Sequence, residues 1–207
     1  MKKCRILSLI LALMLLPGLS SAMPETQTET YTCGDFEYVL LDNGTAEITD
    51  YTGEATNLEI PAVLDGKAVT AIGESAFYGC DTLKSVAIPD SVTEIGDWAF
   101  ANCYLLNDTI LPNSIQTIGM YAFMDCFSLR DFVIPDSVTT IGECAFQSCI
   151  WLQSITVPDS VTQIGDDAFG YCTSLVLTVT RDSYAEQYAN ENGLEYTYPD
   201  AEEQVIN

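Results

Sequence analysis

The sequence contains no histidine and little positive charge. Only 7 lysines and arginines stand against 30 aspartates and glutamates in 207 residues, which gives a formal net charge of −23. Without histidine the chain has no Ser-His-Asp or Cys-His nucleophile pair, no HExxH zinc site and no histidine pH switch. So large a negative charge also argues against a surface that binds nucleic acid or anionic lipid. We therefore expect a non-enzymatic protein with no cofactor and no nucleic-acid partner.

Long apolar runs are scarce as well. The one candidate, Ile6–Leu16, is about 11 residues long, too short to cross a bilayer as a permanent helix. Lys2, Lys3 and Arg5 precede it, and small residues ending at Ala22 follow it. This arrangement is typical of a secretory signal peptide, 1–22, although a buried core helix is an alternative. The expected mature chain is either freely secreted or loosely associated with the cell surface, and it does not insert into a membrane.

What the sequence does contain is an internal repeat of 23 residues. Residues 88–110 read IPDSVTEIGDWAFANCYLLNDTI, and 111–133, 134–156 and 157–179 follow the same pattern, after a longer first copy over 60–87. Each copy repeats an Ile-Gly pair, an Ala-Phe pair, a cysteine and a leucine at fixed spacing. The repeated cysteines are Cys80, Cys103, Cys126, Cys149 and Cys172. Such a period is too short for a helix pair but suits one coil of a leucine-rich solenoid.

One coil can be read in physical terms. A short strand such as 85–88 directs Val86 and Ile88 inward and ends at a proline, which lacks a backbone donor. A second extended piece returns on the opposite face, and the glycine turns a tight corner. The Ala-Phe pair is expected in a single helical or 3₁₀ turn. The pattern therefore predicts a solenoid that is mainly β, with short 3₁₀ or helical turns.

The two ends of the array depart from the repeat. Residues 31–59 contain two strand-like segments around Asn43-Gly44, which predicts a β-hairpin N-terminal cap. Residues 180–198 predict a short helix followed by a strand as the C-terminal cap. A linker over 23–30 and an acidic tail over 199–207 complete the expected organisation around the five repeats of 60–179.

The units IPDSVTxIGxxAFxxCxxL resemble the BspA-like leucine-rich repeat family. The resemblance covers about residues 60–179. It implies a leucine-rich-repeat solenoid that is extracellular, in most cases bacterial, and that serves adhesion or contact between proteins.

The positions that follow the repeated cysteine predict a surface site. They are polar in the first and last repeats but aromatic or aliphatic in the middle three: Tyr104, Leu105, Phe127, Ile150 and Trp151. Equivalent positions stack in a solenoid, so these side chains should be neighbours. They form either ordinary packing between loops or a stripe that binds protein or glycan. Outward strand residues that could surround the stripe are Asp108, Arg130 and Asp131.

The cysteines and acidic residues suggest simpler roles. The five repeated cysteines are expected to be buried, reduced and weak hydrogen-bond donors to the loop backbone. Cys144 lies at a repeat position whose residue type varies from copy to copy, so we expect it to be exposed and available for an intermolecular link. With neither CxxC nor histidine nor an EF-hand loop, we expect no metal site, and the acidic residues are interpreted as solvated surface.

The sequence therefore predicts a secreted, non-enzymatic binding module whose partner is an extracellular or host-surface protein. Two alternatives remain: a self-associating structural protein of the cell envelope, and a carbohydrate-binding module in which Tyr104 and Trp151 stack on sugars.

Overall fold

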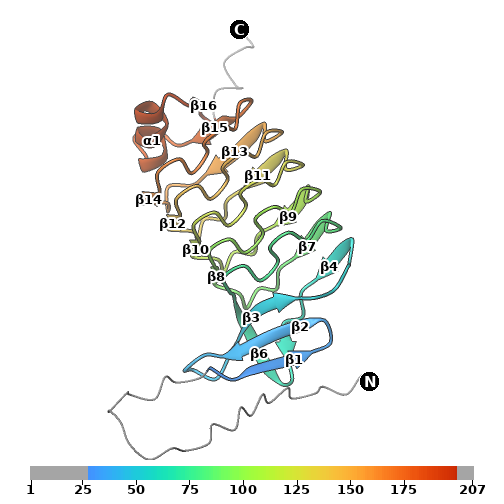
Figure 1. Ribbon diagram of the computed structural model, residues 1–207. Coiled ribbons are helices and arrows are strands. Elements are labelled where there is room, and N and C mark those ends of the chain that lie inside the picture. Colours follow the sequence, from blue (N-terminus) through green and yellow to red (C-terminus); the bar gives the residue numbers. More distant parts are fainter. Residues whose placement is uncertain (1–27, 200–207) are drawn as a thin grey trace, which may run out of the picture.

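The computed structural model describes residues 28–199. These residues form a column of stacked coils, with antiparallel strands at the N-terminal end and one short helix at the C-terminal end (Figure 1). The predicted leucine-rich-repeat solenoid is confirmed. The predicted signal peptide, 1–22, lies outside the described residues, as do most of the predicted linker and tail.

The N-terminal end is built from three antiparallel strand pairs. Strands β1 (Thr30–Cys33), β2 (Phe36–Leu40) and β3 (Ala46–Tyr51) pair antiparallel in that order. Gly44, at φ +79°, occupies the left-handed conformation of the turn between β2 and β3, where glycine is favoured. A short strand, β5 (Val63–Leu64), pairs antiparallel with β6 (Lys67–Ile72). The predicted hairpin cap is confirmed.

A parallel sheet continues from this cap along one face of the solenoid. Strand β3 pairs in parallel with β6, and four two-residue strands follow. They are β8 (Glu94–Ile95), β10 (Thr117–Ile118), β12 (Thr140–Ile141) and β14 (Gln163–Ile164). Their partners are 23 positions apart, as in Ile95 with Ile118, so the sequence period is also the pairing register.

The opposite face carries the longer strands in two separate sheets. The first sheet contains β4 (Asn57–Glu59), β7 (Ser85–Ala87) and β9 (Asp108–Ile110). The second contains β11 (Asp131–Val133), β13 (Ser154–Val157), β15 (Val176–Val179) and β16 (Glu195–Thr197). Strands β9 and β11 belong to successive coils but do not pair in the sheet. We call this whole surface the strand face.

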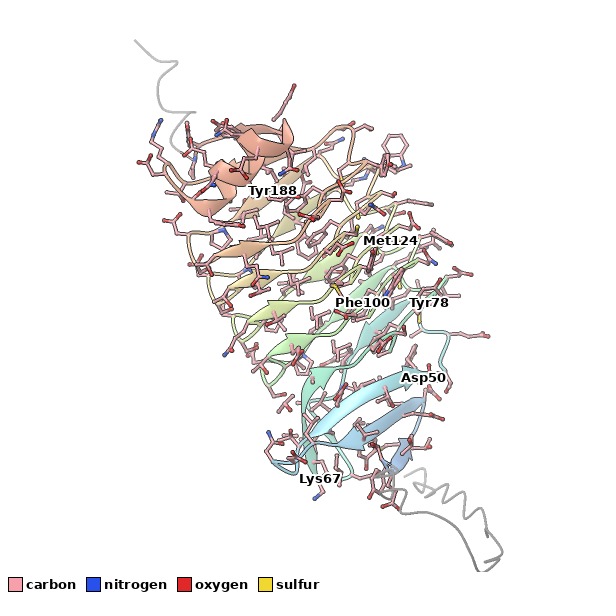
Figure 2. All side chains as sticks on the ribbon, turned by 60° about the vertical axis from the view of Figure 1, so that its left-hand side comes forward. Asp50, Lys67, Tyr78, Phe100, Met124 and Tyr188 are labelled. Atoms are coloured by element: carbon pink, nitrogen blue, oxygen red, sulfur yellow. The ribbon has the colours of Figure 1, made fainter. Side chains whose placement is uncertain are left out.

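The turns between the two faces hold the core together. Phe77, Phe100, Phe123, Phe146 and Phe169 are almost completely buried and stack with ring centroids 4.9 to 5.7 Å apart. The buried Phe100 lies in the middle of the column in Figure 2. The described Ala-Phe segments are isolated turns rather than continuous 3₁₀ helices. Alternate amides, such as Phe77 N–H, donate to the next coil instead, here to the Ala99 carbonyl at 2.8 Å.

The repeated glycine is required by the distance between coils. A Cβ atom at Gly96 would lie 2.8 Å from the carbonyl carbon of Gly73 and 2.9 Å from the amide nitrogen of Glu74. Both are backbone atoms of the preceding coil, so they cannot move aside independently of the stack. The glycine is therefore needed because the backbones of adjacent coils approach too closely for a side chain.

The C-terminal end is closed by a helix and a strand, as predicted. Helix α1 (Tyr184–Asn192) begins at Ser183, whose hydroxyl accepts a hydrogen bond from Glu186 N–H at 3.1 Å. It ends at Gly193, which is left-handed with φ 65°. The Tyr188 hydroxyl accepts the Ala168 N–H at 3.1 Å and so satisfies a backbone donor of the last coil.

Candidate binding surface

The predicted apolar stripe lies where the loops enter the strand face. Its members are Tyr104, Leu105, Phe127, Ile150 and Trp151. The rings of Tyr104 and Phe127 stack with centroids 5.1 Å apart, so these two neighbours are in contact as expected. Tyr104 is 40% exposed and Trp151 is 55% exposed, whereas Phe127 is half-buried between its neighbours. Part of the stripe therefore packs between loops, and part faces solvent.

Trp151 also has a cationic neighbour. The guanidinium carbon of Arg130 lies 5.9 Å from the centroid of the Trp151 ring, within the range of a cation–π contact. Arg130 comes from the end of the preceding coil, just before β11. This contact links the stripe to the strand face, but it also places a positive group beside one face of the indole.

The predicted aspartates form a polar row beside the stripe. Asp108 begins β9 and Asp131 begins β11, and both side chains are exposed. The Asp131 carboxylate accepts a hydrogen bond from the Ser154 hydroxyl at 2.7 Å, which fixes its orientation against the next strand. The structure thus places Tyr104 against Phe127 and Arg130 against Trp151, and it anchors Asp131 to the neighbouring strand.

A second apolar row was not predicted. Two residues beyond each of these aspartates stand Ile110, 78% exposed, and Val133, 67% exposed. Ala87 occupies the equivalent position on β7 and is also exposed. A signal for this row was present: side chains alternate between faces along a strand, so an inward residue at 86 and at 88 places 87 outward. We call Ala87, Ile110 and Val133 the outer row.

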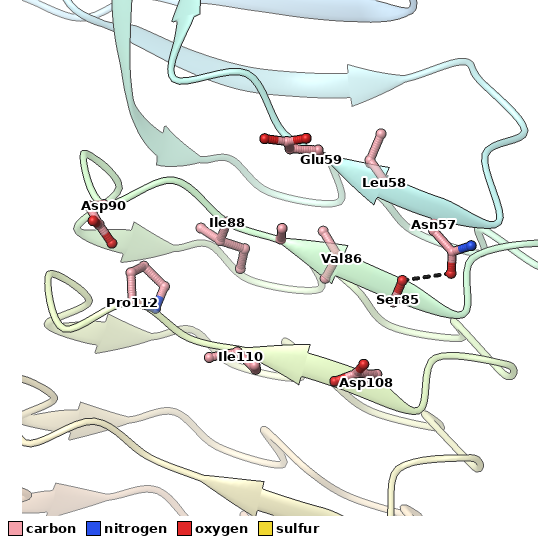
Figure 3. Close-up of a pocket in the computed structure, with 11 residues that line it drawn as sticks. Asn57, Leu58, Glu59, Ser85, Val86, Ile88, Asp90, Asp108, Ile110 and Pro112 are labelled. Atoms are coloured by element: carbon pink, nitrogen blue, oxygen red, sulfur yellow. Dashed lines mark hydrogen bonds between the residues drawn. The ribbon is translucent and has the colours of Figure 1, made fainter.

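Between strands β4 and β9 the surface is hollowed into a groove of about 540 Å³ (Figure 3). Its floor is β7, which presents only the small side chains Ser85 and Ala87 between the larger side chains of β4 and β9. At one end the Ser85 hydroxyl donates to the Asn57 side-chain oxygen at 2.8 Å. We call this depression the β7 groove. Its lining residues are Asn57, Leu58, Glu59, Ser85, Val86, Ala87, Ile88, Asp90, Asp108, Ile110 and Pro112.

The cysteine column is structural. The thiols of Cys103, Cys126, Cys149 and Cys172 each donate to a phenylalanine carbonyl of an earlier coil at 3.1 to 3.2 Å. Burial raises the pKa of the Cys126 thiol, so the thiol stays protonated and can act as a donor. The predicted role of these four cysteines, as buried weak donors to the loop backbone, is confirmed.

The prediction for Cys144 is wrong. Its side chain is only 6% exposed, and the Gln147 amide nitrogen lies 3.3 Å from its sulfur. All five positions at this point of the repeat share a left-handed backbone, but their side chains differ in exposure: Ser75 and Asp167 are exposed, whereas Cys144 is buried. The buried thiol is not available for an intermolecular link.

Residues 28–199 contain neither a membrane-spanning helix nor a candidate metal site. No helix in this range is long and apolar enough to cross a membrane. Within the same residues, no group of three or more cysteines, aspartates or glutamates is placed to hold a metal ion.

Comparison with known proteins identifies the repeat. The family model for the BspA type leucine rich repeat region matches residues 46–176 with six copies. The chain belongs to the BspA-type leucine-rich repeat family. The match begins within β3, at the point where this strand starts to pair in parallel with β6. No curated protein sequence matches the chain at a significant level.

Solved structures of several bacterial proteins show the same fold. A leucine-rich repeat protein of T. pallidum is 36% identical, with a TM-score of 0.68 over 70% of this chain and 68% of its own. A leucine-rich cell surface protein of Faecalibacterium prausnitzii is 33% identical, with a TM-score of 0.68, and the match covers 77% of this chain but only 41% of that protein. The pneumococcal vaccine antigen PcpA, 18% identical over 78% of this chain and 46% of its own, has a TM-score of 0.59 and shares the fold.

Proposed function

We propose that this BspA-type protein is a secreted, non-enzymatic binding module that attaches to an extracellular or host-surface protein through its strand face. The observation that carries the proposal is the set of exposed apolar side chains and aspartates on and beside the strand face. Solvent-exposed apolar patches on soluble proteins mark interaction sites, and aromatic residues contribute strongly at the centre of interfaces. The N-terminal sequence pattern of 1–22 supports export.

A loss-of-binding experiment tests this proposal. The mature chain, residues 23–207, is applied to purified extracellular-matrix and host-surface proteins beside the variant Tyr104→Ser, Phe127→Ser, Trp151→Ser. We expect the wild type to capture a partner and the triple variant to lose at least about ten-fold in affinity, because three aromatic contacts are removed.

The matched control changes three exposed apolar residues away from the stripe: Val63→Ser, Met120→Ser and Tyr184→Ser. These side chains are 54%, 42% and 41% exposed. The control should bind like the wild type, and circular dichroism should show both variants folded. Equal capture by all three proteins would exclude the stripe, and capture by none would contradict the proposed function.

A sugar ligand remains the second candidate because the Trp151 ring is 55% exposed. Soluble glycans that quench tryptophan fluorescence in the wild type but not in Trp151→Ser would support it. Concentration-dependent light scattering that survives the triple substitution would instead support self-association.

A further inference from the structure

The β7 groove has a chemistry of its own. Its centre is aliphatic along one side: Ala87 forms the floor and Ile110 forms one wall (Figure 3). Asp108 stands at one end and Asp90 at the other, and Glu59, whose strand position pairs with Ala87, stands on the side opposite Ile110. No lysine or arginine is among the residues that line it. The groove is therefore an apolar trough between two negative ends.

This arrangement follows the geometry of an extended strand. Asp108 and Ile110 are alternate residues of β9, so their side chains stand on the same face about 7 Å apart. An extended ligand segment has the same spacing between its own alternate side chains. A cationic side chain, an aliphatic side chain and a second cationic side chain at alternate positions would match carboxylate, trough and carboxylate in turn.

We propose that the β7 groove binds an extended, basic segment of a protein partner, with an aliphatic side chain in the trough and a lysine or arginine at each end. The site deepens the proposed protein-binding function and rests on it. The aliphatic side chain removes apolar surface of Ile110 from water. The cations complement the three carboxylates and the negative net charge of the chain, which speeds encounter and selects against acidic partners. Lysine stems also pack on apolar surface while the ammonium group stays in water.

Synthetic peptides test the groove without a known partner. The probe is a fluorescein-labelled nine-residue peptide with lysine, isoleucine and lysine at alternate positions, separated by serines. Fluorescence anisotropy with the mature chain should show saturable binding that weakens as salt rises from about 0.05 M to about 0.5 M. Peptides with glutamate in place of both lysines, or serine in place of isoleucine, should bind at least about ten-fold more weakly.

Variants of the chain locate the binding. Ile110→Ser should lower the affinity for the probe about ten-fold, whereas Val63→Ser, which removes an exposed aliphatic side chain of β5, should not. Asp108→Asn should weaken binding several-fold and reduce its salt dependence, whereas Asp42→Asn in the β2–β3 turn should do neither. Equal effects of the groove variants and their controls would overturn the proposal, as would the absence of saturable binding by the wild type.

The two proposals fail separately. If the probe does not bind but the wild type captures an extracellular protein and the stripe variant does not, the groove proposal fails and the proposed function stands. If the probe binds at Ile110 but no extracellular protein is captured, the groove chemistry stands and the proposed adhesive function fails.

Discussion

Among individual residues, Thr109 departs most clearly from the pattern of the repeat, because it places a polar side chain at a position that is otherwise apolar. Val86, Phe132, Ile155 and Leu177 fill the equivalent inward positions with apolar side chains. The hydroxyl oxygen of Thr109 is buried without a hydrogen-bond partner. Burying an unpaired hydroxyl costs about 1 to 3 kcal/mol, so this position weakens the core at the level of β9.

Replacing Thr109 by valine should therefore stabilise the protein. Thr109→Val keeps the side-chain shape and removes the unpaired hydroxyl, so we expect the free energy of unfolding to rise by about 1 kcal/mol. The urea midpoint measured by circular dichroism checks this. Thr139→Val is the control, because that exposed hydroxyl donates to the Gln116 carbonyl. A lower midpoint for Thr109→Val would show that the hydroxyl has a partner after all.

The sequence predicts the burial of some residues well and that of others poorly. The buried positions of each coil were predictable because the same apolar residue types recur there in every repeat. The exposure of Ile110 and Val133 was also predictable, because side chains alternate between the two faces of a strand. The predicted stripe included only loop residues. The burial of Cys144 could not be predicted from the sequence, because exposure at this repeat position differs from copy to copy, from exposed at Ser75 and Asp167 to buried at Cys144. The β7 groove depends on the relative sizes of neighbouring side chains on three strands, which no single repeat displays.

At the scale of the elements, the two sheets of the strand face have an interruption between them. Strand β9 does not pair with β11, whereas the sheet on the opposite face is continuous from β6 to β14. The interruption coincides with Thr109 on one side and Phe132 on the other. The Phe132 ring contacts Phe123 and Phe146 edge-on, with centroids 5.4 and 5.1 Å away, so the core stays filled at this level.

The corners between elements depend on the glycine column, and Gly96→Ala tests this. The added methyl would overlap the backbone of the preceding coil, which should lower the free energy of unfolding by about 1 to 3 kcal/mol. Thermal denaturation measures the loss. Gly170→Ala is the control, because its Cβ would meet its nearest atom at 3.1 Å and the equivalent positions already carry Ala101 and Met124. Equal losses for both variants would contradict a special role for the corner.

On the scale of the whole molecule, the stacked coils protect one another. Cys103, Cys126 and Cys149 lie in the interior coils and are fully buried, while Cys80 in the first repeat is half-buried. Burial raises the pKa of the Cys126 and Cys149 thiols, and thiol reagents attack the thiolate.

Labelling of these thiols should therefore report global unfolding. We expect the interior three cysteines to react with an alkylating reagent at the rate of complete unfolding, and Cys80 to react sooner. Mass spectrometry of peptides after timed labelling in increasing urea measures both rates. Labelling of Cys126 as fast as Cys80 in native buffer would show that the coils open individually.

The repeated contacts also mean that the length of the solenoid can change only by whole coils. Each coil meets the next through the same glycine, phenylalanine and cysteine columns, so deletion of residues 111–133 would join equivalent positions and leave every column filled. Each coil gained or lost shifts the distance between the two caps by about 4.8 Å. The length of the strand face can thus change in fixed steps during evolution, without redesign of either end.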